Sequence, residues 1–246
     1  MRLRRAVPLV IVFALAACSS DDTSSVEPGP PVAKDPEAVT RERMVDDTIA
    51  RRNVKDERVL AAMRKVPRHA FVPAELRAQA YEDRALPIGL KQTISQPYIV
   101  AVMAEVARIE PGDRVLEIGT GSGYGAAVLA ELARDVYTIE ILEPLAKRAA
   151  ETLRELGYDN VHVRFGDGYK GWPSHQPFDA IVVTAAPPSV PEPLKQQLAI
   201  GGRLVIPVGK YRQSLRVITR TKDGFEESSV LPVRFVPMTG EAQKGD

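Results

Sequence analysis

Short apolar runs separated by glycine, proline and charged residues recur through the last two thirds of the chain. These runs predict strands at 114–118, 136–139, 161–165, 180–183, 204–208, 215–219 and 230–235. Amphipathic segments predict helices at 124–133, 145–156 and 193–198. Alternating strands and helices are typical of a doubly wound, mainly parallel sheet, and the late strands without helices between them predict an antiparallel edge. We therefore expect an α/β fold.

A helical extension is predicted before this alternating region. The pattern turns helical at about Val39, and Asp56 is placed to cap a helix that continues through Arg64. Another helix is predicted to begin at Pro97, because proline lacks only an N–H group that the first helical position does not use. That helix should end before Pro111.

A glycine-rich turn connects the first predicted strand of the sheet to its helix. The sequence is VLEIGTGSGYG, with glycines that include Gly119, Gly121 and Gly123. Glycine lets the backbone turn sharply and approach a ligand, and a helix N-terminus offers free N–H groups to it. Glu140 ends the next strand, 21 residues after Gly119, where an acidic side chain can accept the hydroxyl groups of a ribose. The pattern predicts a Rossmann-like nucleotide site.

The glycine turn alone does not distinguish a dinucleotide from S-adenosylmethionine, because G-x-G-x-x-A is also present. Two acidic positions favour S-adenosylmethionine. Glu117 lies two residues before Gly119, which resembles the E/D-x-G-x-G-x-G arrangement of class I methyltransferases. Asp167, followed by Gly168, ends the third strand, where that family holds the adenine amino group. A nicotinamide-dependent oxidoreductase is the alternative.

Ordered blocks from about Met44 to Gly240 resemble the protein-L-isoaspartate O-methyltransferase family. They include Val66-Pro67-Arg68, AYED at 80–83, LPIG at 86–89, TISQPY at 93–98, VLEIGTGSGY, GDG, FDAIVVTAA, GGRLVIPVG and RFVPMTG. The resemblance implies methyl transfer from S-adenosylmethionine to the α-carboxylate of isoaspartyl residues, as a step in protein repair. The partners would be isoaspartyl-containing proteins or peptides. Whether Tyr81 and Asp83 contact substrate or serve local structure stays open.

Ser95 matches the active-site serine of that family, and Thr239 lies near a position that contacts cofactor in some members. A carboxylate is already ionised at neutral pH, so the reaction needs no general base. Ser95 can donate a hydrogen bond to it, beside a helix whose N-terminus also favours an anion. We therefore expect Ser95 to position the substrate. The scattered histidines form no metal-ligand pattern, and no metal is expected.

The first 17 residues are typical of a bacterial secretory signal. Three arginines lie near the start, a short apolar run follows, and residues 15–18 (LAAC) resemble a lipobox ending at Cys18. We expect a lipoprotein-type signal at 1–17, a disordered Ser/Pro-rich tether at 18–36 and a methyltransferase domain at 37–246. The membrane would be contacted only through a lipid on Cys18, which predicts a location in the cell envelope or periplasm.

The signal conflicts with a cofactor made in the cytosol, and three interpretations follow. The protein is an exported enzyme, an exported non-catalytic binder of isoaspartyl-damaged proteins, or a cytoplasmic enzyme whose translation starts at Met44. The intact motif residues favour an enzyme. The formal net charge of +1 gives no basic field for nucleic acid, so no nucleic-acid partner is expected. We expect a monomer.

Overall fold

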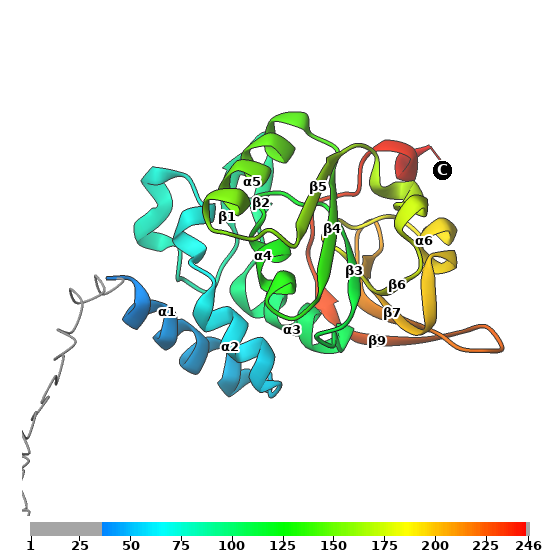
Figure 1. Ribbon diagram of the computed structural model, residues 1–246, viewed down its shortest axis with the longest axis horizontal. Helices are drawn as coiled ribbons and strands as arrows, with labels where there is room; N and C mark the ends of the chain where they lie inside the picture. Colours follow the sequence, from blue (N-terminus) through cyan, green and yellow to red (C-terminus); the bar gives the residue numbers. More distant parts are fainter. Residues whose placement is uncertain (1–35, 245–246) are drawn as a thin grey trace, which may run out of the picture. The chain divides into compact units, whose positions relative to one another are not determined.

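Seven strands form the central sheet in the computed structural model, which describes residues 36–244 (Figure 1). The strand order is β5-β4-β3-β6-β7-β8-β9. The strands are β3 (Arg114–Ile118), β4 (Asp135–Glu140), β5 (Val161–Phe165), β6 (Phe178–Val183), β7 (Leu198–Val208), β8 (Gln213–Arg220) and β9 (Phe225–Val233). Pairs from β5 to β7 are parallel, and β7, β8 and β9 pair antiparallel. This confirms the predicted Rossmann-like sheet with its antiparallel edge.

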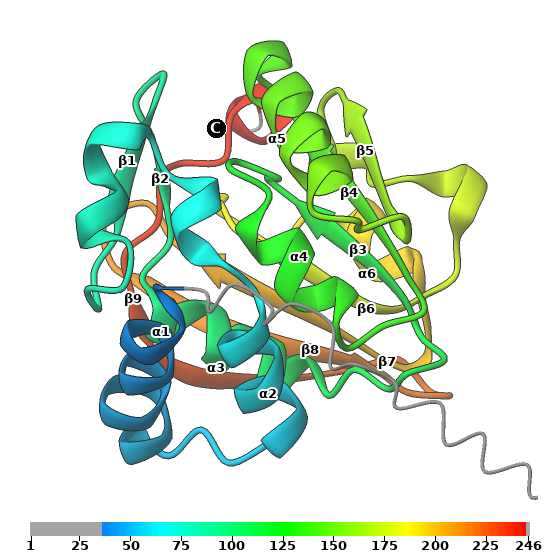
Figure 2. The same cartoon turned by 60° about the vertical axis from the view of Figure 1, so that its left-hand side comes forward.

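Helices cover both faces of the sheet at its centre, so the central strands are apolar on both sides. Val115, Val182 and Val205 belong to a core with α3 (Pro97–Ala107), α4 (Tyr124–Ala130) and α5 (Glu143–Glu155). Leu116, Ile181 and Leu204 face the other way, into a core with α6 (Glu192–Gln196). Figures 1 and 2 show α3, α4 and α5 on one side of the sheet and α6 on the other.

The predicted helical extension packs beside α3 and α4. Helix α1 (Ala38–Met44) continues through a π-helical turn (Val45–Ile49) and a 3-10 turn (Ala50–Arg52), and α2 spans Glu57–Lys65. The Asp56 carboxylate accepts the Arg58 N–H at 2.9 Å, which confirms the predicted cap. Two further 3-10 turns follow, at Arg68–Phe71 and Ala74–Gln79.

A two-stranded hairpin that was not predicted lies between this extension and α3. Strands β1 (Leu86–Gly89) and β2 (Gln92–Ile94) pair antiparallel, with Leu86 opposite Ile94. The turn consists of Leu90 and Lys91, which both have left-handed backbones, with φ of 50° and 58°. Glycine or asparagine is usual at these two positions, so Leu90 and Lys91 themselves give no signal for the turn, although Gly89 directly before them also has a positive φ of 89°.

Several predicted boundaries were wrong for physical reasons. Helix α4 ends at Ala130 rather than at residue 133, and α6 ends at Gln196, because Leu198 already belongs to β7. Strand β7 runs through Gly201-Gly202, where a side chain at Gly202 would lie 3.0 Å from the carbonyl oxygens of Phe178 and Asp179. Gly202 therefore occupies a crowded position inside β7 and does not interrupt the strand. Strand β9 starts five residues before the predicted position, on an exposed edge without alternating apolar residues.

No helix within residues 36–244 is long and apolar enough to cross a bilayer. The predicted signal at 1–17 and the predicted tether at 18–36, apart from its last residue, lie outside the described residues.

Candidate active site

The main pocket lies at the carboxyl ends of β3, β4 and β6, and the strand order reverses between β3 and β6. Ligands bind at such switch points in open α/β sheets. The empty space is about 1050 Å³ when the solvent at its open mouth is included. Its walls come from the hairpin strand β2, the glycine loop, the ends of β3, β4 and β6, and the segment after β9. The lining residues are Gln92, Thr93, Ile94, Ser95, Val100, Met103, Ala104, Glu117–Gly125 except Gly123, Leu129, Ile139, Glu140, Ile141, Gly168, Val182, Thr184, Ala185 and Val236–Thr239.

The glycine loop adopts backbone conformations that side chains disfavour. Gly119, Gly121 and Gly123 have φ of 96°, 56° and 91°. A Cβ atom on Gly119 would overlap the Thr184 hydroxyl, which donates a 2.6 Å hydrogen bond to the Gly119 carbonyl. Gly123 is the N-cap residue of α4 and packs against α5, where Leu153 would lie 3.2 Å from its Cβ. Gly119 and Gly121 line the pocket, whereas Gly123 shapes the loop from outside it.

Glu117 is buried on the pocket wall, with 1 % of its surface exposed. Its carboxyl group accepts a 2.6 Å hydrogen bond from the Thr138 hydroxyl, which itself contacts the Thr120 hydroxyl at 2.6 Å. Burial, with a smaller contribution from the charge of Glu140, raises the pKa of Glu117 to about 8 against the lowering effect of the Thr138 bond. The site therefore holds a carboxyl group that a nearby positive charge would ionise.

Glu140 ends β4 and is also buried, with 5 % of its surface exposed. One carboxylate oxygen accepts the Gly121 N–H at 2.8 Å and the other accepts the Leu142 N–H at 2.9 Å. These bonds hold the carboxylate between the glycine loop and the start of α5. Each oxygen retains acceptor capacity for a ligand hydroxyl group.

Gly125 gives the Glu117 carboxyl group its room, because a Cβ there would lie 2.4 Å from Glu117 Oε1. We predict that Gly125→Ala lowers the free energy of unfolding by about 1–3 kcal/mol, the usual cost of overpacking. Gly112→Ala is the matched control, since nothing lies within 4 Å of its Cβ position. Thermal unfolding with and without S-adenosylhomocysteine measures both variants. Equal stability and equal ligand affinity in the two variants would contradict this view of Gly125.

Asp167 follows β5 and does not itself line the pocket. Its carboxylate caps the 3-10 turn Gly168–Lys170 through the Tyr169 N–H at 2.9 Å, and its other oxygen accepts the Glu241 N–H at 2.8 Å. Only Gly168 of this pair lines the pocket. A Cβ on Gly168 would collide with Ile118, which explains glycine there. Asp167 thus joins the cofactor loop to the C-terminal segment.

The C-terminal segment supplies one wall of the pocket. Thr239 lines the pocket together with Val236, Pro237 and Met238. Hydrogen bonds between Ala186 and both Val236 and Met238 hold the segment against the end of β6. The RFVPMTG block was the available signal for these residues. Gln92, Thr120 and Thr138 were also missed, because their proximity depends on strand pairing.

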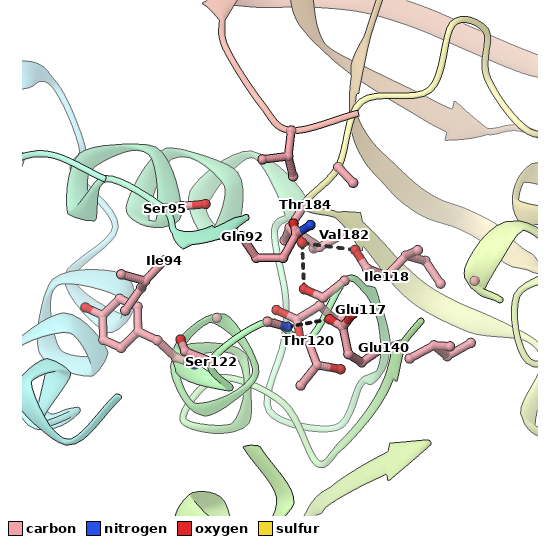
Figure 3. Close-up of a pocket in the computed structure, with 18 of the residues that line it drawn as sticks. Gln92, Ile94, Ser95, Glu117, Ile118, Thr120, Ser122, Glu140, Val182 and Thr184 are labelled. Atoms are coloured by element: carbon pink, nitrogen blue, oxygen red, sulfur yellow. Dashed lines mark hydrogen bonds between the residues drawn. The ribbon is translucent and has the colours of Figure 1, made fainter. Parts of the chain in front are cut away.

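Ser95 lies between β2 and α3 and lines the same pocket. Figure 3 shows it across the open space from Glu117 and Glu140. The structure therefore brings Ser95 together with Glu117, Gly119, Gly121, Glu140, Gly168 and Thr239. The N-terminus of α3 was predicted to favour a substrate anion. One of its N–H groups is not free for that role, because the Tyr98 N–H already donates to the Asp83 carboxylate at 3.2 Å.

The charged side chains that line the pocket distinguish between the two candidate ligands, S-adenosylmethionine and a dinucleotide. Its titratable carboxyl groups are Glu117 and Glu140, and no lysine, arginine or histidine is among the described residues that line it. Two carboxyl groups in a low-dielectric site favour a positively charged ligand and oppose a pyrophosphate. The site therefore fits S-adenosylmethionine, a sulfonium cation with an ammonium group, better than a dinucleotide.

The model of the protein-L-isoaspartate(D-aspartate) O-methyltransferase family matches residues 39–243. The chain belongs to this family. A protein-L-isoaspartate O-methyltransferase of Gloeobacter violaceus is 62 % identical over 200 residues, covering 80 % of this chain and 98 % of the relative. A protein-L-isoaspartate O-methyltransferase 2 of Anaeromyxobacter is 49 % identical over 238 residues, covering 96 % of this chain and 98 % of the relative.

A solved structure of a family protein from Plasmodium falciparum, in complex with S-adenosyl-L-homocysteine, superposes with a TM-score of 0.70. It is 26 % identical and covers 81 % of this chain and 98 % of that chain. These findings confirm the predicted resemblance, enzyme class and cofactor. They favour a family methyltransferase over an oxidoreductase or a non-catalytic binder.

Proposed function

We propose that this protein transfers a methyl group from S-adenosylmethionine to the α-carboxylate of isoaspartyl residues in damaged proteins. The observation that carries the proposal is the arrangement of one pocket. Its closed end holds the buried carboxyl groups of Glu117 and Glu140, and Ser95 lies on the opposite wall. A cationic methyl donor and an anionic methyl acceptor are thus given separate, complementary surroundings.

S-adenosylmethionine supplies an electrophilic methyl group when bound. The residues placed to hold it are Glu117, Gly119, Gly121, Glu140 and Gly168, with Thr239 beside them and Gly123 shaping the loop. Glu140 would accept ribose hydroxyl groups. Asp167 would act through the loop and the C-terminal segment that its carboxylate joins, with acceptor capacity left for an amino group.

The acceptor carboxylate is ionised at neutral pH, so this chain's residues need only position it. Ser95 would donate its hydroxyl hydrogen to one carboxylate oxygen and leave the other oxygen to attack. Ile94, Val100 and Met103 line the pocket beside Ser95 and limit access of water. In the family, the resulting ester loses methanol as it cyclises to a succinimide, which hydrolyses partly to normal aspartate.

The bond formed by the transfer provides a direct test. A carboxyl methyl ester is hydrolysed by mild base and releases methanol, whereas a methylated amine does not. We expect an isoaspartyl peptide treated with the enzyme and labelled S-adenosylmethionine to release volatile label in base. Stable, base-resistant label would assign the transfer to a different acceptor group and contradict the proposal.

The raised pKa of Glu117 predicts a pH dependence of stability. The folded, ligand-free protein keeps the Glu117 carboxyl group protonated up to about pH 8, whereas an unfolded chain ionises it near its ordinary pKa of 4.5. The unfolded state thus loses its proton first, and the free energy of unfolding falls as pH rises between these values. Glu117→Gln should remove this fall. Parallel pH dependences of denaturant unfolding in wild type and Glu117→Gln would contradict the prediction.

We also propose that the protein is a monomeric, exported lipoprotein, with the methyltransferase domain at 37–246 joined to a lipid on Cys18 by the 18–36 tether. The proposal is supported by the signal-like composition of residues 1–17 and by the single cysteine in the chain. The Anaeromyxobacter relative aligns with 96 % of the chain, so the alignment reaches into the first 35 residues. This favours translation of the segment before Met44 over a start at Met44.

Cell fractionation, with mass spectrometry of the mature N-terminus, tests the location. A lipidated Cys18 in the membrane fraction is expected. A soluble protein that begins at Met44 would contradict export and support the cytoplasmic alternative.

A further inference from the structure

We infer that Asp83 is a positioning residue that fixes Ser95 for the methyl transfer. The inference rests on the proposed function and adds to it a residue outside the pocket wall. Asp83 does not line the pocket. It acts on the residues that follow Ser95, through the Gln96 side chain and the Tyr98 N–H.

Four hydrogen bonds from three residues converge on Asp83. Its carboxylate accepts Gln96 Nε2 at 2.8 Å, Arg52 Nη1 at 2.8 Å and the Tyr98 N–H at 3.2 Å. Its backbone carbonyl accepts Gln96 Nε2 at 3.1 Å. The Arg52 guanidinium also lies 3.5 Å above the Tyr98 ring, which closes the cluster. The Asp83 side chain is 18 % exposed, so these bonds are partly shielded from water.

Ser95 is held between two links that join the same pair of segments. On one side, Ile94 pairs with Leu86 in the hairpin. On the other side, Gln96 is bonded to Asp83, three residues before Leu86. Tyr98, in the first turn of α3, adds a third anchor. Ser95 is the single residue between Ile94 and Gln96, so its backbone has little freedom while both links hold.

The segment that carries Asp83 is itself fixed by a buried cation. Arg68 is fully buried, donates from Nε to the Ala80 carbonyl at 2.8 Å and contacts the Arg84 carbonyl from Nη2 at 3.4 Å. These two carbonyls bracket Asp83 in sequence. The AYED block therefore serves local structure that reaches the active site, which answers the question that the sequence left open for Asp83.

The inference predicts a loss in the chemical step without a loss of cofactor affinity. In Asp83→Asn, only one acceptor oxygen remains. If it takes the place of the oxygen that Gln96 and Arg52 share, the new amide N–H groups face the Tyr98 N–H, so at least one link breaks and Arg52 loses its charged partner. We expect kcat for an isoaspartyl peptide to fall about 10- to 100-fold, the usual result of misplacing a positioning group. The Kd for S-adenosylhomocysteine should stay within about twofold, since Glu140 and the glycine loop are untouched.

A swapped pair distinguishes positioning from general destabilisation. Asp83→Asn combined with Gln96→Glu restores a hydrogen bond of opposite sense, keeps the net charge and returns a carboxylate to Arg52. This double variant should recover most of kcat. Asp56→Asn is the matched control, because the Asp56 carboxylate also caps a helix and pairs with an arginine, Arg58, but these bonds do not reach residues 94–98.

Wild type, Asp83→Asn, the double variant and Asp56→Asn should be assayed in parallel as full chains. Hydrogen exchange of the segment containing residues 94–98 should be measured in each protein. Faster exchange there in Asp83→Asn, with slowed methylation that the swap restores, is the expected result. Unchanged kcat and exchange in Asp83→Asn would overturn the inference, and so would an equal loss of kcat in Asp56→Asn. A wild type without methyl transfer would refute the proposed function, and the exchange data would still decide the role of Asp83.

Discussion

Replacing Glu140 with alanine is expected to weaken S-adenosylhomocysteine binding by roughly 100- to 1000-fold. The variant loses an acceptor for the ribose hydroxyl groups and leaves the N–H groups of Gly121 and Leu142 without their partner. Bonds to a charged group contribute about 1.5–3 kcal/mol each, and two at the lower value correspond to about 100-fold in affinity. Isothermal titration calorimetry measures the change.

Glu143→Ala is the matched control for this prediction. Glu143 is also a glutamate near the start of α5, but it is half-exposed and pairs with Lys147 on the surface. Its removal should leave ligand affinity within about twofold, since exposed pairs contribute little. Affinity near that of wild type in a folded Glu140→Ala protein would show that Glu140 does not hold the cofactor.

Ser95→Ala is expected to lower methylation of an isoaspartyl peptide about 10- to 100-fold while leaving cofactor affinity nearly intact. The loss corresponds to one hydrogen bond to a charged group, about 1.5–3 kcal/mol. The attacking atom belongs to the substrate, so a measurable rate should remain. Steady-state kinetics with both substrates varied separates the effect on kcat from the effect on cofactor binding.

Ser95→Thr and Ser214→Ala complete the design. Threonine keeps a hydroxyl group and should retain most of the activity. Ser214 lies on the exposed face of β8, where its hydroxyl group contacts Ser229, and its loss should have no kinetic effect. Unchanged turnover in Ser95→Ala would remove Ser95 from the site, and complete loss of turnover would favour a covalent role over positioning.

Local sequence signals were sufficient for the parts of the site that lie on single elements. The strand before the glycine loop was predicted at the observed bounds of β3, because a short apolar run is followed directly by glycines with positive φ. Glu117 and Glu140 follow from their distance to that loop along the chain. Parallel pairing then brings the ends of β3 and β4 together.

The remaining parts depend on contacts between distant segments. Leu90 and Lys91 form a hairpin turn with no glycine or asparagine at its two central positions. Asp83 reaches the start of α3 across the hairpin, and Asp167 bonds to Glu241, 74 residues further along the chain. Neither partner could be named from spacing alone. Family resemblance identified the blocks, but only the fold shows which of them touch.

The most direct test of the account measures methyl transfer from labelled S-adenosylmethionine to an isoaspartyl peptide and to its normal aspartyl twin. The two peptides differ only in which carboxyl group continues the backbone. We predict transfer to the isoaspartyl peptide alone. Equal transfer to both peptides, or none from a folded protein that binds S-adenosylhomocysteine, would contradict a repair methyltransferase specific for isoaspartate.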